Sequence, residues 1–135
     1  MVKVLGCWEL GWSTPIMEFD LWHFPLRDFE VDEFMMSPVS GIARNVTEYK
    51  NIEDAINANK NLTPIFLDED GDVELDKFIH PVDVLYIFGK ASYSPFSARA
   101  KKGQSVKIET GAGKGMLWPH QAASIVLRDR YLKWR

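Results

Sequence analysis

Residues 105–135, "SVKIETGAGKGMLWPHQAASIVLRDRYLKWR", decide how the chain folds. The run from Ser105 to Thr110 predicts a short strand. Three alternating glycines follow it, and Pro119 then opens an amphipathic segment that predicts a helix over 119–134. The glycine turn between the strand and the helix is therefore the first candidate for a ligand site.

Strands and helices also alternate in the rest of the chain. Strands are predicted over 2–5, 32–36, 63–67 and 82–88, and the last of these, "VDVLYIF", is the clearest buried strand. Helices are predicted from Pro15 until Pro25 breaks or bends the first, over 52–59, and as one turn over 75–79. A polar loop is predicted over 90–104. This alternation predicts a single α/β domain over 1–135, with a mostly parallel sheet flanked by helices.

Composition places the chain among ordinary globular proteins. It has 135 residues, of which 46% are hydrophobic and 26% are charged, enough for one domain and not comfortably for two. The single cysteine, Cys7, gives no internal disulfide, and no stretch approaches the roughly 18 apolar residues of a membrane span. No signal-peptide pattern opens the sequence. We therefore expect a cytoplasmic protein.

Charge is divided unevenly along the chain. Residues 1–89 hold 6 Lys/Arg and 17 Asp/Glu, whereas residues 90–135 hold 10 Lys/Arg and 2 Asp/Glu. The net charge of −3 thus conceals an acidic part of −11 and a basic part of +8. Either the two parts attract each other, within or between subunits, or the basic part contacts phosphates, as in nucleic-acid binding.

The glycine turn matches no standard phosphate loop. The P-loop pattern G-x-x-x-x-G-K-[ST] fails because Lys114 is followed by Gly115. The dinucleotide pattern G-x-G-x-x-G fails because Met116 stands at its third glycine. Glycines nevertheless let a backbone approach a ligand closely and present N–H groups at a helix start. The turn is either a ligand contact or a plain tight turn.

Other candidate sites are weaker. The acidic turn Asp68–Asp72 lacks the glutamate that a calcium loop has at its twelfth position, where Ile79 stands. Cys7 is expected to be a buried thiol. No metal-ligand spacing relates the histidines, for which structural or surface roles are expected: His23, His80 and His120. The aromatic residues near the first helix form either core or a subunit interface: Trp8, Trp12, Phe19, Trp22 and Phe24.

The element order near the end of the chain resembles the C-terminal half of the SPOUT superfamily, the trefoil-knotted RNA methyltransferases. A strand ends in "YIFG" (86–89), and a loop, the strand "VKIET" (106–110), a glycine turn and the helix "MLWPHQAASIVLRDRYLK" (116–133) follow. The family has a strand ending in F-G, a strand of I-P type, and S-L-N-V before an alanine-rich helix. The matching positions are Leu117, Ala122, Ala123, Ile125 and Leu127.

This resemblance implies a fold and a cofactor site. The C-terminal chain would form a trefoil knot in an α/β domain, and backbone groups of three loops would hold S-adenosylmethionine. Carried onto this sequence, the implied cofactor-binding residues are Leu67, Asp68, Phe88, Gly89, Lys90, Ile108, Gly111, Gly113, Gly115, Met116 and Leu117.

The resemblance also implies methylation of an RNA, tRNA or rRNA, by a homodimer that pairs across its first and last helices. Phe24 stands where the family commonly has a catalytic arginine, so the nearby polar residues His23 and Arg27 become the catalytic candidates. The implied RNA-binding residues are Arg99, Lys101, Lys102, Lys114, Arg128 and Arg130.

Two alternative functions stay open. Because the usual catalytic side chains are missing, the chain could be a non-catalytic knotted protein that binds RNA or serves as a dimeric interaction module. It could also be an unrelated α/β hydrolase that uses Asp68, Asp70 and Asp72 with magnesium. A hydrolase of that kind would tolerate changes in the glycine turn.

Overall fold

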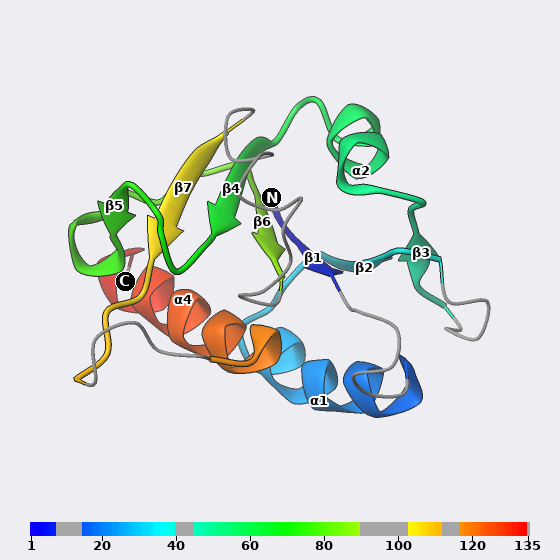
Figure 1. The fold of residues 1–135 in the computed structure, drawn as a ribbon, viewed down its shortest axis with the longest axis horizontal. Helices are drawn as coiled ribbons and strands as arrows, with labels where there is room; N and C mark the ends of the chain where they lie inside the picture. The colour runs from blue at the N-terminus through cyan, green and yellow to red at the C-terminus, as the bar shows by residue number, and fades with distance from the viewer. Residues whose placement is uncertain (8–14, 40–44, 90–102, 112–116, 135) are drawn as a thin grey trace.

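The structure, a computed structural model, describes residues 1–7, 15–39, 45–89, 103–111 and 117–134. Figure 1 shows the course of the chain through these residues. The α-helices in them are α1 (Pro15–Asp28), α2 (Ile52–Ala58) and α4 (Pro119–Trp134). The strands are β1 (Val2–Cys7), β2 (Glu33–Ser37), β3 (Thr47–Glu48), β4 (Thr63–Leu67), β5 (Val73–Glu74), β6 (Val84–Phe88) and β7 (Gln104–Lys107). One turn of 3₁₀ helix, η1 (Leu75–Lys77), follows β5.

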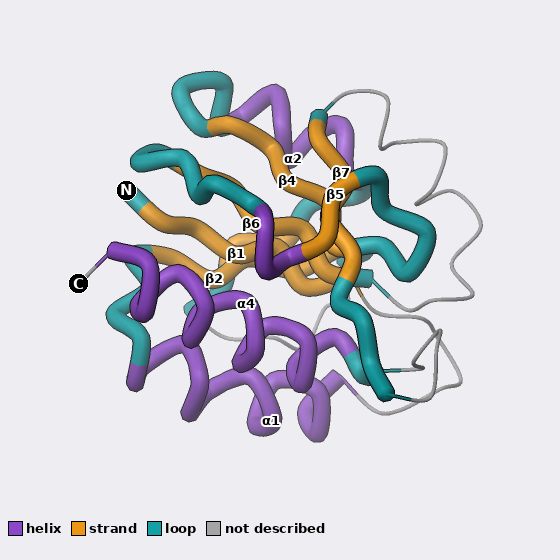
Figure 2. The backbone as a smooth tube through the Cα atoms, turned by 90° about the vertical axis from the view of Figure 1, so that its left-hand side faces the viewer, coloured by secondary structure: helices purple, strands orange, loops and turns teal. Residues whose placement is uncertain are grey.

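The seven strands form one sheet in the order β3-β2-β1-β6-β4-β7-β5, and every pairing between neighbours is parallel. Figure 2 shows α1 and α4 side by side on one face of this sheet and α2 on the other, with both chain termini at the same end. The prediction of a mostly parallel sheet flanked by helices is confirmed.

Both faces of the sheet are buried, which explains why its strands are apolar without alternation. All five residues of β6 are buried. On one face, Tyr86 and Phe88 pack in a cluster with Trp22 of α1 and with Ala123 and Val126 of α4. On the other face, Leu85 and Ile87 pack in a cluster with the α2 residues Ile52 and Ala55. The central strand β6 therefore joins two hydrophobic layers.

The predicted elements agree with the observed ones, with some corrections. The last helix spans 119–134 as predicted, and the strand 63–67 is also confirmed. Pro25 does not end the first helix, which continues to Asp28, and the carbonyl of Pro25 accepts a hydrogen bond from the N–H of Phe29 at 3.2 Å. The prediction missed β3 and β5, because two residues are too few to show a periodic pattern.

The strands predicted over 82–88 and 105–110 have different bounds in the structure. The first begins at Val84, since Val82 is exposed and lies before the sheet. The second spans Gln104–Lys107 and so begins within the predicted polar loop, most of which lies outside the described residues. Among the helices that the structure describes, none is both long and apolar enough to cross a membrane.

Candidate functional site

The strands β1, β4, β6 and β7 end side by side, at what we call the carboxyl edge of the sheet. Phe88 pairs with both Gly6 and Leu67, and Leu67 pairs in turn with Val106. In Figure 1 the arrowheads of β4, β6 and β7 all point toward this edge. The carboxyl edge is where open parallel α/β sheets bind ligands. The structure thus brings together five residues predicted to bind a cofactor: Leu67, Asp68, Phe88, Gly89 and Ile108.

Hydrogen bonds fix the acidic turn that follows β4. The N–H of Asp68 donates to the carbonyl oxygen of Val106 at 2.9 Å, which joins the turn to β7. The carboxylate of Asp68 accepts from the N–H of Asp70 at 3.0 Å, and its carbonyl accepts from the N–H of Gly71 at 2.9 Å. The turn is therefore closed by its own contacts. Within the described ranges, no three His, Cys, Asp or Glu residues are grouped so that they could hold a metal ion.

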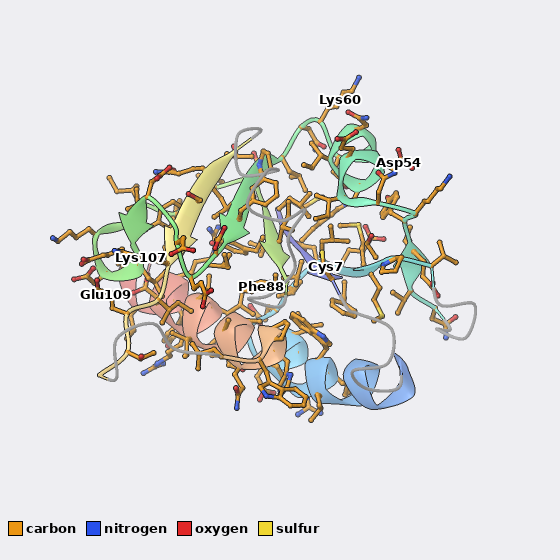
Figure 3. All side chains as sticks on the ribbon, viewed as in Figure 1. Cys7, Asp54, Lys60, Phe88, Lys107 and Glu109 are labelled. Atoms are coloured by element: carbon orange, nitrogen blue, oxygen red, sulfur yellow. The ribbon has the colours of Figure 1, made fainter. Side chains whose placement is uncertain are left out.

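The side chains at the carboxyl edge are mainly apolar. Phe88 and Leu67 are only 1% and 7% exposed, and Ile108 packs against the same cluster. Cys7 lies at the end of β1, near Phe88 in Figure 3, and burial raises the pKa of its thiol to about 12. The thiol is therefore protonated at neutral pH, and the expectation of a buried thiol is confirmed. Such an edge offers a ligand apolar walls and backbone N–H and C=O groups.

The predicted glycine turn is only partly described. Gly111 is exposed, and a Cβ atom placed on it would meet no heavy atom within 4 Å. Leu117 lies half-buried just before α4, whose start is capped by a 2.9 Å hydrogen bond from the N–H of Trp118 to the side chain of Gln121. The other predicted cofactor-binding residues lie outside the described ranges: Lys90, Gly113, Gly115 and Met116.

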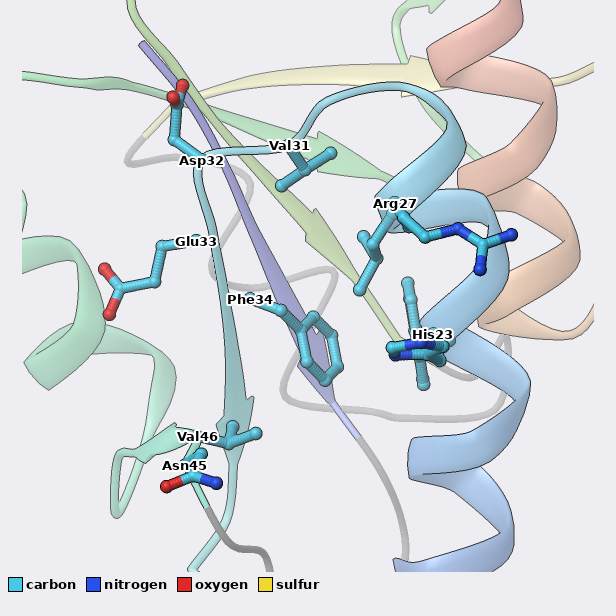
Figure 4. Close-up of a pocket in the computed structure, with 10 residues that line it drawn as sticks. His23, Arg27, Val31, Asp32, Glu33, Phe34, Asn45 and Val46 are labelled. Atoms are coloured by element: carbon cyan, nitrogen blue, oxygen red, sulfur yellow. The ribbon is translucent and has the colours of Figure 1, made fainter.

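His23 and Arg27, the predicted catalytic residues, line a pocket of about 350 Å³ between α1 and β2. Figure 4 shows His23 facing Phe34 across this pocket, with Val46 and Asn45 at its far end. Arg27 lies in the last turn of α1, where its guanidinium pairs with the carboxylate of the adjacent Asp28 at 3.2 Å. The structure thus brings the two residues together, but among the described residues no predicted cofactor-binding residue lines their pocket.

Trp22 connects this pocket with the carboxyl edge. Its ring lies 5.1 Å from the ring of Phe34 in the pocket and 5.7 Å from the ring of Phe88 at the edge, measured between centroids. Gly6 on β1 makes room for this packing, because a Cβ atom there would lie 3.1 Å from atoms of both Trp22 and Phe34. Trp22 is therefore core. His23 follows Trp22 directly, and Arg27 lies one helical turn further along α1.

The predicted RNA-binding residues Arg128 and Arg130 both lie near the end of α4. Arg130 donates hydrogen bonds to the carbonyl oxygens of Pro81 at 2.6 Å and Val82 at 3.1 Å. Arg128 is exposed, and its guanidinium carbon lies 5.2 Å from the centre of the Tyr131 ring. Arg130 is thus bound to the protein's own backbone. The other predicted RNA-binding residues lie outside the described ranges: Arg99, Lys101, Lys102 and Lys114.

A buried polar network that was not predicted lies at the opposite end of the sheet. The side chain of His80 is 0% exposed. Its Nδ1 lies 2.6 Å from the hydroxyl oxygen of Tyr86, and its Nε2 lies 2.7 Å from Oδ2 of Asp129. The sequence signal was the tyrosine inside the apolar run 84–88, because a buried tyrosine hydroxyl needs a partner.

Comparison with known proteins supports the fold. No protein-family model matches the chain, and no curated protein matches it by sequence. Among solved structures, a Bacillus anthracis protein provisionally assigned as an RNA methyltransferase matches with a TM-score of 0.75 and 14% identity, over 98% of this chain and 94% of that one. The SpoU methyltransferase AviRb of Streptomyces viridochromogenes, in complex with AdoMet, matches with a TM-score of 0.75 and 12% identity, over 98% of this chain and 57% of that one.

A third solved structure, an RNA 2′-O ribose methyltransferase, matches with a TM-score of 0.73 and 10% identity, over 98% of this chain and 56% of that one. The chain therefore has the fold of the SpoU methyltransferases, and the predicted resemblance to the SPOUT superfamily is confirmed for the fold. It spans little more than half the length of AviRb and of the ribose methyltransferase.

Proposed function

We propose that this protein is an S-adenosylmethionine-dependent RNA methyltransferase that binds its cofactor at the carboxyl edge. One observation carries the proposal: β4, β6 and β7 end next to one another at the same edge of the sheet. The residues that follow them, Asp68, Gly89 and Ile108, therefore lie in neighbouring loops. The structure of AviRb, which has this fold, contains AdoMet.

The described residues at the carboxyl edge fit the chemistry of this cofactor. Its flat adenine ring suits the apolar surface of Ile108, which is partly buried and packs against the cluster that contains Leu67 and Phe88. Backbone N–H and C=O groups in the three loops suit its polar adenine, ribose and amino-acid groups. The open space at Gly111 leaves room for a ligand where a larger side chain would intrude. In this proposal the site is completed by Lys90, Gly113, Gly115, Met116 and Leu117.

When bound, S-adenosylmethionine supplies the methyl group, which leaves the sulfonium sulfur for a nucleophilic atom of the RNA. The chain's role is to hold the accepting atom of the RNA in line with the bond between the methyl group and the sulfur. Such alignment of reactants lowers the activation barrier by roughly 7–11 kcal/mol. A base is needed only where the accepting atom carries a proton, as a ribose 2′-hydroxyl does. We assign the role of this base to His23, and we propose that Arg27 orients a phosphate of the substrate.

The RNA, a tRNA or rRNA in this proposal, is bound by the basic part of the chain. Residues 90–135 carry ten basic and two acidic side chains, a balance that favours contact with phosphates. Arg128 is exposed near the end of α4 and is the best placed of the described candidates. Arg99, Lys101, Lys102 and Lys114 belong to the same proposed surface.

A homodimer is part of the proposal, because the helical face of the molecule leaves large apolar side chains exposed. Trp118, Ile125 and Leu132 are each about 40% exposed and follow one another at intervals of seven residues, so they form one stripe along α4. Leu21 is similarly exposed on α1, the neighbouring helix. We propose that this stripe pairs with the same stripe of a second copy.

Two further expectations belong to the same proposal. The trefoil knot is supported by the likeness to SpoU methyltransferases over 98% of this chain, although the predicted path includes 90–102 and 112–116, outside the described residues. A cytoplasmic location is supported by the one unpaired cysteine, since disulfides are rare in that compartment.

Calorimetric titration with S-adenosylmethionine and S-adenosylhomocysteine tests the cofactor site. The decisive variant is Gly111→Val, because the structure leaves open space at this glycine. We expect the native protein to bind both ligands, and the variant to fold with unchanged melting temperature but to lose binding. The control is Ile79→Ser, which changes an 88% exposed side chain at the other end of the sheet and should leave binding intact. Absence of binding to the native protein at millimolar ligand would remove the proposal.

The alternative, a non-catalytic RNA-binding or interaction protein, is favoured by one observation. Arg27 is already paired with Asp28, and no described cofactor-binding candidate lines the pocket that Arg27 shares with His23. A methyl-transfer assay with labelled S-adenosylmethionine and an RNA pool separates the two functions. If the protein binds the cofactor and transfers its methyl group, and His23→Ala or Arg27→Ala reduces this transfer, the enzyme is supported. If it binds RNA without any methyl transfer, the alternative is supported.

A further inference from the structure

The last two turns of α4 are fastened to the segment 75–82 by charged side chains. Arg130 donates from Nη1 to the carbonyl oxygen of Pro81 at 2.6 Å and from Nη2 to that of Val82 at 3.1 Å. Lys133 donates from Nζ to the carbonyl oxygens of Leu75 at 2.6 Å and Phe78 at 2.9 Å. One helix end thus satisfies four carbonyl groups in the segment that leads into β6.

His80 occupies the centre of this contact. Its buried ring lies between Tyr86 of β6 and Asp129 of α4, with contacts of 2.6 Å from Nδ1 and 2.7 Å from Nε2. Oδ2 of Asp129 also pairs with Nζ of Lys133 at 2.8 Å. The ring of Phe78 meets the His80 ring edge-on, with 4.9 Å between their centroids. The titratable or charged groups that face His80 are therefore Tyr86 from the sheet and Asp129, Arg130 and Lys133 from α4.

Only the neutral Nε2–H form of His80 satisfies every member of this network. Nη1 of Arg130 lies 3.3 Å from the hydroxyl oxygen of Tyr86, and a guanidinium can only donate. The Tyr86 oxygen therefore accepts from Arg130, and its own hydrogen is free to point at Nδ1 of His80. Nδ1 must then be an unprotonated acceptor, which leaves the proton on Nε2, where it donates to the carboxylate of Asp129.

Protonation of the ring disrupts this arrangement in two ways. The new N–H at Nδ1 points at the hydroxyl of Tyr86, whose hydrogen must turn away from its acceptor in a fully buried place. The ring also becomes a cation between two existing cations, Arg130 and Lys133, with Asp129 as the carboxylate in contact with it. Protonation of His80 keeps the contact with Asp129 but weakens the rest of the network that holds the end of α4.

We propose that this network is a proton-sensitive latch: neutral His80 holds the last two turns of α4 against the segment 75–82, and protonation of the ring in mildly acidic solution releases them. Burial, the larger effect, lowers the pKa of His80, while the contact with Asp129 opposes it. A histidine whose folded-state pKa is lowered contributes stability above its unfolded pKa of about 6.5, and that stability is lost as the pH falls below this value. The latch does not depend on the cofactor site.

Amide hydrogen exchange of the full chain between pH 8 and pH 5 tests the latch. We expect the amides of residues 126–134 to lose protection below about pH 6.5, after correction for the intrinsic pH dependence of exchange. The expected loss is about tenfold for each pH unit between the unfolded and folded pKa values of His80. The central strand β6 should keep its protection in the same samples.

Two variants identify the titrating group. His80→Gln keeps a donor and an acceptor but cannot be protonated in this range, so its protection over 126–134 should not change from pH 8 to pH 5. His120→Gln is the matched control, since it removes a histidine from the other end of α4 and should keep the native pH dependence. Equal loss of protection in the native protein and His80→Gln would overturn the proposal, as would constant protection in the native protein.

Nitrogen-15 NMR of the native protein tests the same proposal should His80→Gln fail to fold. At pH 7 the signals of His80 should show a proton on Nε2 and an unprotonated Nδ1. The opposite tautomer, or a doubly protonated ring at pH 7, would show that the hydrogen-bond chain from Arg130 through Tyr86 to His80 is wrong.

Discussion

The two edges of the sheet are held in different ways. At the amino edge, where the strands begin, charged groups tie distant segments together: the amino group of Met1 pairs with Asp83 at 2.7 Å, and the carboxylate of Asp32 accepts from the N–H of Val2 at 2.7 Å. At the carboxyl edge the acidic turn is joined to β7 through the backbone of Asp68 and Val106. In the proposed function, charged contacts stabilise the amino edge, while the backbone groups of the carboxyl edge are left available to the cofactor.

The largest effect is expected from removing the aromatic packing beneath the carboxyl edge. Trp22→Ala deletes a side chain that is 1% exposed and that packs against both Phe34 and Phe88. We expect the free energy of unfolding to fall by about 3–5 kcal/mol, as for other buried aromatic residues. Urea denaturation measures this change.

The adjacent residue gives the control for Trp22→Ala. Leu21→Ala truncates a side chain that is 41% exposed, so the free energy of unfolding of a monomer should change by less than about 1 kcal/mol. Equal losses in the two variants would contradict the role of Trp22 as the residue that joins the His23 pocket to the carboxyl edge.

A smaller effect is expected near the end of α4, from Lys133→Met. The substitution keeps most of the apolar stem but removes the donor to the carbonyl oxygens of Leu75 and Phe78. The carbonyl of Leu75 keeps the N–H of Phe78 as a donor, but that of Phe78 loses Lys133, and the pairing of Lys133 with Asp129 is also lost. The free energy of unfolding should therefore fall by about 1–3 kcal/mol. Cofactor binding should be unchanged, since Lys133 lies in the last turn of α4 and is none of the residues proposed to hold the cofactor.

Lys77→Met is the matched control for Lys133→Met. Lys77 is 76% exposed and pairs with Glu74 at 3.9 Å, so its loss should be close to neutral in denaturation. A neutral Lys133→Met would show that the contacts of Lys133 do not hold the end of α4. Loss of cofactor binding in Lys133→Met would show that the end of α4 and the carboxyl edge are coupled.

The sequence predicted the parts of the fold that depend on local signals. Pro119 and the periodic residues after it were sufficient to place α4, and the run 82–88 was sufficient to predict the buried strand that the structure places over Val84–Phe88. Pro25, predicted to break or bend the helix, does not break it, because packing of the buried Trp22 and Leu26 holds the helix through it. Tertiary packing thus overrides a local helix-breaking signal.

Contacts between distant segments explain what the sequence could not predict. Arg130 counted as a free positive charge in the sequence, but the fold brings it to the carbonyl groups of Pro81 and Val82, some 50 residues earlier. His80 had no neighbour in sequence that indicated its link to Asp129. A charge count cannot distinguish a basic side chain that is already bound from one that is available to RNA.

The smallest effect is expected from two carboxyl groups at the β5 end of the sheet, where Figure 3 labels Glu109 beside Lys107. A hydrogen bond with Glu109 and repulsion from its charge raise the pKa of Glu74. Because the pKa of Glu74 is raised in the folded state, the contact between Glu74 and Glu109 stabilises the protein at low pH. This contribution is lost as the pH rises through the raised pKa. Glu109→Gln should therefore raise the melting temperature slightly at pH 7 and hardly change it at pH 4.

Glu30→Gln removes one negative charge from a site outside this pair and controls for the change in net charge. If both variants raise the melting temperature equally at pH 7, the gain comes from the net charge of −3 and not from the contact between Glu74 and Glu109. If only Glu109→Gln raises it, the β5 end of the sheet carries a local electrostatic cost at neutral pH. In contrast to these two like charges, the amino group of Met1 and the side chain of Lys133 each pair with a group of opposite charge.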